Sequence, residues 1–329
     1  MLVPAKIILD HAFANSYAVG AFNVNNMEQV QAIIDAAAQT QSPVIIQVSR
    51  GALEYSRMTY LRNLIQAAAE EHPEIPVAMH LDHGNGLEVV KTAIDLGFTS
   101  VMIDGSLDET AKKPNTFEQN LAVTQAVLKY ARPFGVTVEA ELGTLGGIED
   151  GVGSGHINVT DPDEAIEFIA KAPVDSLAIA IGTSHGAYKF SGECKLAYDV
   201  LEEIHSRLPE QPIVMHGSSS VPQELIAEIN KYGGQMPNAR GVDIEALQKA
   251  IPHGVAKINV DTDGRLAVTA AIRKVLVEHP EEFDPRKYLG AARDALTEVI
   301  ALRMQQFGAA GNAPKINQIG LTEAKELYS

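Results

Sequence analysis

Three histidines that each precede a glycine are the residues of this sequence best suited to bind a metal: His83, His185 and His216. Three neutral imidazoles that leave one coordination position open suit a catalytic zinc ion. A single histidine at a strand end is more often a hydrogen-bonded structural residue. Three histidine–glycine pairs favour a metal site, because a glycine beside a ligand lets backbone or substrate approach closely.

Carboxylates accompany these histidines. Asp82 directly precedes His83 in HLDHG. Asp104 and Glu141 could form a second, oxygen-rich metal position, or they could hold the histidines in place, and the residues alone leave both interpretations open. His80 shares a strand face with Asp82 by the two-residue period, so we expect it to support the site and not to bind metal.

Glycine-rich and hydroxyl-rich segments surround the same residues. The stretch 143–156 predicts a lid over the site, with a solvated surface loop as the alternative. The segments HGSSS and SHGAY offer backbone N–H groups and hydroxyls that suit a phosphate. The segment 259–265 adds Asn259 and Asp261, while Arg265 would contact a phosphate or pair with an acid.

Eight short apolar runs could position these residues, at 18–24, 43–49, 76–83, 100–106, 137–143, 176–186, 212–219 and 254–263. They are nearly continuous in Val, Ile and Ala, as buried parallel strands are, and helical periodicity lies between them. We therefore predict an α/β fold, a (β/α)8 TIM barrel forming a single domain over 1–329. The polar residues stand at the C-terminal ends of the runs, which converge on one face of a barrel. A C-terminal helical extension is expected at 284–308, and an inserted surface loop at 233–241.

The overall charge limits the choice of partners. The chain has 26 Lys and Arg against 42 Asp and Glu, a net charge of −16, which argues against binding nucleic acid or an anionic membrane. Cys194 is the only cysteine, so no intrachain disulfide can form. With no signal peptide or long apolar run in the sequence, we expect a cytoplasmic protein.

Eight motifs follow one another along nearly the whole chain: GAFNVNN, QVSRGA, HLDHG, MIDGS, VEAELGTLGG, GTSHGAY, MHGSSS and KINVDTDGR. Together they resemble the class II, metal-dependent fructose-bisphosphate aldolases. The resemblance implies a lyase that reversibly cleaves fructose 1,6-bisphosphate to dihydroxyacetone phosphate and glyceraldehyde 3-phosphate in glycolysis and gluconeogenesis. It also implies a Zn²⁺ cofactor, a second divalent position, a monovalent cation, and a homodimer or homotetramer.

The same resemblance implies residue roles. Asp82 matches the catalytic acid/base, and Glu149 matches a lid glutamate that protonates the enediolate carbon, although Ile148 replaces an acid that some members carry beside it. His83, His185 and His216 match the zinc ligands, and Asp104 with Glu141 matches the second metal position. Ser49 matches a contact to the aldehyde half, and Arg265 an arginine for the far phosphate. The dihydroxyacetone-phosphate site would comprise Gly186, Gly217, Ser218, Ser219, Asn259, Val260, Asp261 and Thr262.

Several alternatives remain. Tagatose-bisphosphate aldolases are close relatives, but NVDTD in place of their NVATE-type motif, together with the loop at 233–241, favours fructose bisphosphate. A Schiff-base mechanism would use Lys257 or Lys189 and would leave the three histidines unexplained. Zinc hydrolases with this fold commonly carry an HxH motif on the first strand, which AFNV lacks. A non-catalytic sugar-phosphate-binding barrel would not need Asp82 and Glu149.

Overall fold

Eight parallel strands form a closed barrel in chain order, and β1 pairs with both β2 and β8. The computed structural model describes residues 1–329 except 109, 111–112, 145–157, 190–194 and 329. Seven strands fall within the predicted runs and β3 extends one residue beyond its run, to Gly84, which confirms the (β/α)8 barrel. Their bounds are Val19–Asn23 (β1), Val44–Val48 (β2), Val77–Gly84 (β3), Ser100–Ile103 (β4), Thr137–Leu142 (β5), Ser176–Ile179 (β6), Ile213–Met215 (β7) and Val255–Val260 (β8).

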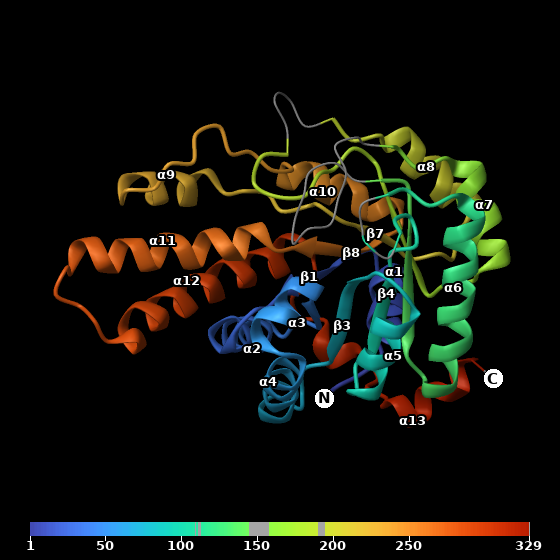
Figure 1. The fold of residues 1–329 in the computed structure, drawn as a ribbon, viewed down its shortest axis with the longest axis horizontal. Coiled ribbons are helices and arrows are strands. Elements are labelled where there is room, and N and C mark those ends of the chain that lie inside the picture. The colour runs from blue at the N-terminus through green and yellow to red at the C-terminus, as the bar shows by residue number, and fades with distance from the viewer. Residues whose placement is uncertain (109, 111–112, 145–157, 190–194, 329) are drawn as a thin grey trace.

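Helices alternate with the strands and surround the barrel (Figure 1). The α-helices are Ala5–Ala14 (α1), Met27–Thr40 (α2), Arg50–Ser56 (α3), Met58–Glu71 (α4), Leu87–Asp95 (α5), Phe117–Ala131 (α6), Pro162–Lys171 (α7), Tyr198–Arg207 (α8), Gln223–Lys231 (α9), Ile244–Ala250 (α10), Thr262–Glu278 (α11), Pro285–Gln306 (α12) and Leu321–Ala324 (α13). Short 3₁₀ turns are Arg132–Phe134 (η1), Ile251–His253 (η2), Ala313–Lys315 (η3) and Lys325–Tyr328 (η4).

Local sequence explains where several helices begin and end. Asn26 caps α2 by accepting a hydrogen bond from the backbone N–H of Gln29. Asp161 caps α7 by accepting from the backbone N–H groups of Asp163 and Glu164. Gly97, with a φ of 87°, follows the end of α5 in the left-handed conformation that commonly terminates a helix.

Apolar packing closes one end of the barrel. Ile8 and Leu9 of α1 share an apolar cluster with Ala21 of β1, Ala78 of β3 and Ala256 of β8. A larger core lies between the strands and the surrounding helices. Since α1 covers the N-terminal ends of the strands, the polar C-terminal ends remain as the face that can receive a substrate.

The C-terminal helical extension is present as α12, which packs along α2 and α11. Figure 1 shows α11 and α12 reaching away from the barrel side by side. Arg303 of α12 donates to Asp263 of α11 at 2.9 Å, and Asp263 also accepts hydrogen bonds from Ser220 and Val221 after β7. This buried pair connects the extension to a loop of the open end.

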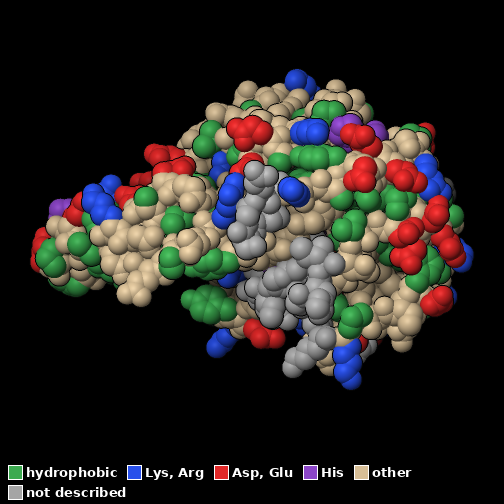
Figure 2. Space-filling model, turned by 90° about the horizontal axis from the view of Figure 1, so that it is seen from above, with side chains coloured by type: hydrophobic (Ala, Val, Ile, Leu, Met, Phe, Trp, Pro, Cys, Tyr) green, Lys and Arg blue, Asp and Glu red, His purple; other side chains and the backbone are tan. Residues whose placement is uncertain are grey.

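The predicted insert at 233–241 lies between α9 and α10 and has no helix or strand of its own. It is hydrogen-bonded to the segment after β6, because Arg240 donates its N–H to Ala187 and accepts from Lys189. Seen from above (Figure 2), a few basic side chains lie on a surface that also carries many acidic groups.

No helix in the described part of the chain is both long and apolar enough to cross a membrane. The assignment of residues 1–329 to one domain stays a prediction, as does a cytoplasmic location.

Candidate active site

The C-terminal ends of the strands surround one pocket that contains many of the predicted residues. Its lining is Asn23, Gln47, Ser49, Arg50, Asp82, His83, His185, Gly217, Ser218, Ser219, Asn259 and Asp261. These residues belong to the ends of β1, β2, β3 and β8 or to the segments that follow β2, β6, β7 and β8, and Arg50 is the first residue of α3. The barrel therefore brings together side chains that are up to 238 residues apart in the sequence (261 − 23 = 238).

His83 lies at an irregular point of β3. Its φ is 49°, in the left-handed region, and the pairing of β3 with β4 shifts register between Leu81 and Gly84. Adjacent side chains of a regular strand point to opposite faces, so Asp82 and His83 would not share a pocket without this irregularity. Gly84 makes it possible, since a Cβ there would lie 2.6 Å from the carbonyl oxygen of Met102.

Asp82 is held by three amide side chains. Asn23 Nδ2 and Gln47 Nε2 donate to its Oδ2 at 3.1 and 3.4 Å, and Asn259 Nδ2 donates to its Oδ1 at 3.4 Å. Burial alone would raise the pKa of Asp82, but the nearby His83, His216 and Lys257 lower it overall. The side chain is thus an oriented carboxylate that can accept a proton.

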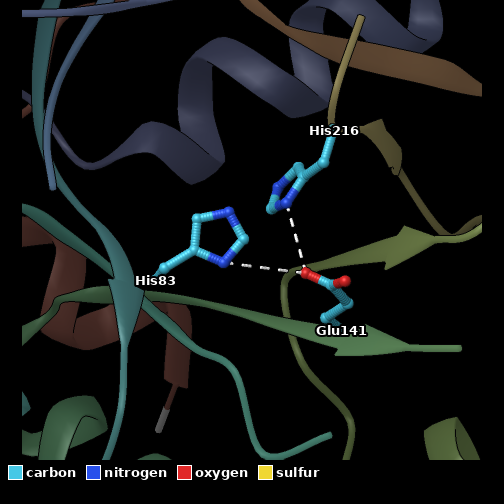
Figure 3. Close-up of side chains that lie close together, drawn as sticks. All are labelled: His83, Glu141 and His216. Atoms are coloured by element: carbon cyan, nitrogen blue, oxygen red, sulfur yellow. Dashed lines mark ion pairs between the residues drawn. The ribbon is translucent and has the colours of Figure 1, made fainter. Parts of the chain in front are cut away.

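His83, His216 and Glu141 form a compact group of metal-binding side chains (Figure 3). One ligand atom from each lies within 4.8 Å of the other two. Within the described residues, Nδ1 of His83, Nδ1 of His216 and Oε2 of Glu141 are buried and none forms a hydrogen bond of acceptable geometry, although the last two atoms lie 3.2 Å apart. Buried polar atoms in this state are costly, and a divalent cation would satisfy all three. The residues present therefore fit a metal ion.

Neighbouring carboxylates raise the pKa of both histidines in this group. Burial would lower the pKa of His83, yet Asp82, Asp104 and Glu141 raise it to about 10 in the absence of metal. Burial would likewise lower the pKa of His216, but contacts with Glu139 and Glu141 raise it overall. These carboxylates keep His83 protonated in the absence of metal, so binding of a cation there must displace that proton.

The other two predicted metal ligands lie next to this group. The ring of His185 is 5.3 Å from that of His83, centroid to centroid, although His185 is not part of the compact group. Asp104 Oδ2 lies 3.7 Å from His83 Nδ1, while its Oδ1 accepts two hydrogen bonds from Ser106. Asp104 and Glu141 thus approach the same nitrogen of His83, which is compatible with either a second metal position or a supporting role.

Lys257 is part of a buried polar network and cannot serve as a Schiff-base lysine in this state. Its ammonium group has three N–H donors, and they face Glu139 Oε1 at 3.0 Å, Glu139 Oε2 at 2.9 Å and His80 Nε2 at 3.3 Å. Burial and Lys257 lower the pKa of His80 to about 3, so His80 is neutral and donates its Nδ1–H to Ser100. His80 supports the network, as its strand position predicts.

Two predicted phosphate-binding segments lie together at the pocket. Gly217 has a φ of 58°, and a Cβ there would lie 2.7 Å from the carbonyl oxygen of Ser184, so the loops after β6 and β7 meet closely. Ser219 Oγ accepts hydrogen bonds from the backbone N–H groups of Asp261 and Thr262 at 3.2 and 3.1 Å. These bonds fix the start of α11 against the loop after β7.

Four predicted substrate residues are absent from the pocket lining in the described part of the chain: Gly186, Val260, Thr262 and Arg265. Val260 belongs to the apolar core, so only its backbone could reach a ligand. Arg265 forms an ion pair with Asp261, at 2.8 Å from Nε and 2.6 Å from a terminal nitrogen. Of the two roles open to Arg265, pairing with an acid is the one that the structure contains.

Glu149 and all of the predicted lid at 143–156 except Gly143 and Thr144 lie outside the described residues. Three residues that were not predicted as site residues also line the pocket: Asn23, Gln47 and Arg50. Each stands at or just after the end of a predicted strand, and the same end-of-strand rule that identified Asp82 applies to them.

Known proteins are similar to this chain in sequence and in fold. The family model described as "Fructose-bisphosphate aldolase class-II" matches residues 3–312. The chain is 55% identical to a fructose-bisphosphate aldolase of Giardia intestinalis, covering 99% of both chains. It is 53% identical to one of Nostoc sp., covering 100% of this chain and 96% of the other. The crystal structure of the YdjI aldolase from Escherichia coli K12 superposes with a TM-score of 0.77 at 28% identity, covering 95% and 100% of the two chains.

Proposed function

The chain belongs to the class-II fructose-bisphosphate aldolase family, and from that premise we propose that it reversibly cleaves fructose 1,6-bisphosphate with the help of Zn²⁺. The products are dihydroxyacetone phosphate and glyceraldehyde 3-phosphate. One observation carries the proposal: the oriented carboxylate of Asp82 lies beside the unsatisfied metal-binding atoms of His83, His216 and Glu141.

Asp82 has the geometry of a general base. Three amides orient its carboxylate, and its lowered pKa keeps it ionised at neutral pH. In cleavage it would take the proton of the C4 hydroxyl, and in condensation it would return it. Zinc, when bound, would supply a Lewis acid for the negative charge that cleavage leaves on the substrate. Glu149 is proposed to protonate the carbon.

We propose His83, His185 and His216 as the residues that hold the zinc. His216 would use Nδ1, because its Nε2 already donates to Glu139 at 2.8 Å. Asp104 and Glu141 would hold a second divalent cation or support the first. A monovalent cation, and assembly into a homodimer or homotetramer, stay predictions.

The substrate is tested by comparing two sugars. Purified protein with zinc is expected to cleave fructose 1,6-bisphosphate with a higher kcat/KM than tagatose 1,6-bisphosphate, measured by coupled detection of dihydroxyacetone phosphate. A preference for tagatose 1,6-bisphosphate would support the tagatose aldolase instead. Binding of either sugar without any cleavage would indicate a non-catalytic binding protein.

Arg50 is our candidate for the far phosphate. It lines the pocket beside Ser49, and its Nε is buried without a hydrogen-bond partner in the described structure. Arg265, by contrast, is engaged with Asp261. A guanidinium aimed into a pocket for a dianionic phosphate can form charge-assisted hydrogen bonds. The other phosphate would lie against Gly217, Ser218 and Ser219, the glycine- and hydroxyl-rich segment after β7 that lines the pocket.

Replacing Arg50 with Met should lower kcat/KM for fructose 1,6-bisphosphate about 10- to 100-fold, mainly through KM. That range corresponds to a charged hydrogen bond of roughly 1.5–3 kcal/mol. Arg57→Met is the matched control, since this exposed arginine at the end of α3 loses the same charge outside the pocket. Steady-state kinetics of both variants decide the matter, and an unchanged KM in Arg50→Met would remove Arg50 from the phosphate site.

A further inference from the structure

Lys257 and Glu139 form a buried ion pair directly behind a metal-binding histidine. The ammonium of Lys257 contacts both oxygens of Glu139, at 3.0 and 2.9 Å, and Oε1 of Glu139 lies 2.8 Å from Nε2 of His216. The Lys257 and Glu139 side chains are only 1% and 2% exposed. The three residues come from β8, β5 and β7 or the residue that follows it, so the contacts connect three parts of the barrel wall.

The direction of each hydrogen bond follows from the groups involved. Lysine can only donate, and a carboxylate engaged by lysine accepts. Nε2 of His216 must therefore donate its proton to Glu139. That leaves Nδ1 of His216 as the metal-facing nitrogen, and it lies 3.2 Å from Glu141 Oε2 in the compact group (Figure 3).

We propose that Lys257 is a positioning residue of the metal site: it fixes the carboxylate of Glu139, which in turn holds the His216 ring with Nδ1 toward the metal. The inference rests on the proposed zinc-dependent function. Contact with both oxygens at 3.0 and 2.9 Å fixes the plane of the carboxylate more firmly than its other two contacts would, which are the hydrogen bond to His216 and a longer one of 3.4 Å from Ser176 Oγ. Partners that orient a metal-bound imidazole change metal affinity by roughly 10- to 100-fold when they are removed.

A purely structural role is the competing explanation. Buried ion pairs add little net stability compared with well-packed apolar side chains, whereas removal of one partner leaves a costly unpaired charge. A test must therefore separate folding stability from metal binding. The third contact of the Lys257 ammonium is to Nε2 of the neutral His80, at 3.3 Å, and His80 is not one of the metal-binding residues in the compact group.

Lys257→Met removes the ammonium and keeps much of the side-chain volume. Its zinc dissociation constant, measured by competition with a chromophoric chelator, is expected to rise about 10- to 100-fold above that of the unmodified protein. If the unmodified protein binds no zinc, the proposed function fails. If the unmodified protein binds zinc and Lys257→Met binds it equally tightly, the positioning role is wrong.

A second variant keeps the proposal testable if Lys257→Met folds poorly. The double variant Lys257→Met with Glu139→Gln has no unpaired buried charge and keeps an amide oxygen for His216. We expect its thermal stability to recover while its zinc dissociation constant stays raised, because only the long hydrogen bond from Ser176, at 3.4 Å, is left to orient the amide. Recovery of both quantities would show that the pair is only structural. Arg303→Met, which breaks the buried pair with Asp263, is the control and should leave zinc affinity unchanged.

Discussion

Asp82→Asn should lose most of its turnover while still binding zinc. An asparagine has nearly the same shape as aspartate, so it can still lie among Asn23, Gln47 and Asn259, but it cannot accept the proton of the C4 hydroxyl. Loss of a positioned general base costs about 10²- to 10⁴-fold in rate, and we expect kcat to fall within that range. KM should change far less, because the carboxylate moves a proton and does not hold a phosphate.

Two measurements accompany that variant. Zinc content by elemental analysis should equal that of the unmodified protein, which separates a lost base from a lost metal. Asn23→Ala provides a graded comparison: it removes one of the three amide contacts to Asp82, at 3.1 Å, and should lower kcat by a smaller factor. Near-normal kcat in Asp82→Asn would remove Asp82 from proton transfer.

Removal of the metal should have an effect of similar or larger size. A Lewis acid at the reacting oxygen contributes several kcal/mol of charge stabilisation, and about 4 kcal/mol corresponds to roughly 10³-fold in rate. Dialysis against a chelator should therefore reduce cleavage of fructose 1,6-bisphosphate at least that far. The unsatisfied atoms of His83, His216 and Glu141 would be left buried, so the metal-free protein should also unfold at a lower temperature.

Returning zinc should restore both properties, whereas Mg²⁺ should restore them poorly, since two of the three atoms in the compact group are imidazole nitrogens.

Borohydride reduction in the presence of substrate is the companion experiment. A covalent adduct at Lys257 together with chelator-resistant activity would support the Schiff-base alternative, which the three engaged donors of Lys257 argue against.

The barrel could be predicted from the sequence because its strands are buried on both sides. Such strands appear as short continuous apolar runs, and PVIIQVS and SVMIDGS contain β2 and β4 with their polar ends attached. Once the fold is a closed parallel barrel, every strand ends on the same face. The proximity of Asp82, His185 and Asn259 then follows from topology and needs no knowledge of side-chain packing.

Other features depend on geometry that the sequence does not contain. The period of two places Asp82 and His83 on opposite faces, and only the irregular backbone of β3 brings both into one pocket. Arg265 could equally have met a phosphate or an acid, and its pairing with Asp261 depends on the first turn of α11. Val260 was predicted as a substrate residue because it lies within a matching motif, yet its side chain belongs to the core.

The role of Lys257 also could not be assigned from the sequence alone. Its sequence context, a lysine within an apolar strand, is compatible with a nucleophile, a surface group or a structural ion pair. The distinction depends on Glu139 and His80, which are more than a hundred residues away and meet it only inside the barrel.

Anomalous diffraction at the zinc absorption edge, from crystals of the zinc-loaded protein, would show where the metal binds. We expect one strong peak about 2.0–2.1 Å from Nδ1 of His216 and from ring nitrogens of His83 and His185, next to the carboxylate of Asp82. A zinc peak outside this group, or none at all in protein that cleaves fructose 1,6-bisphosphate, would contradict the metal-dependent mechanism.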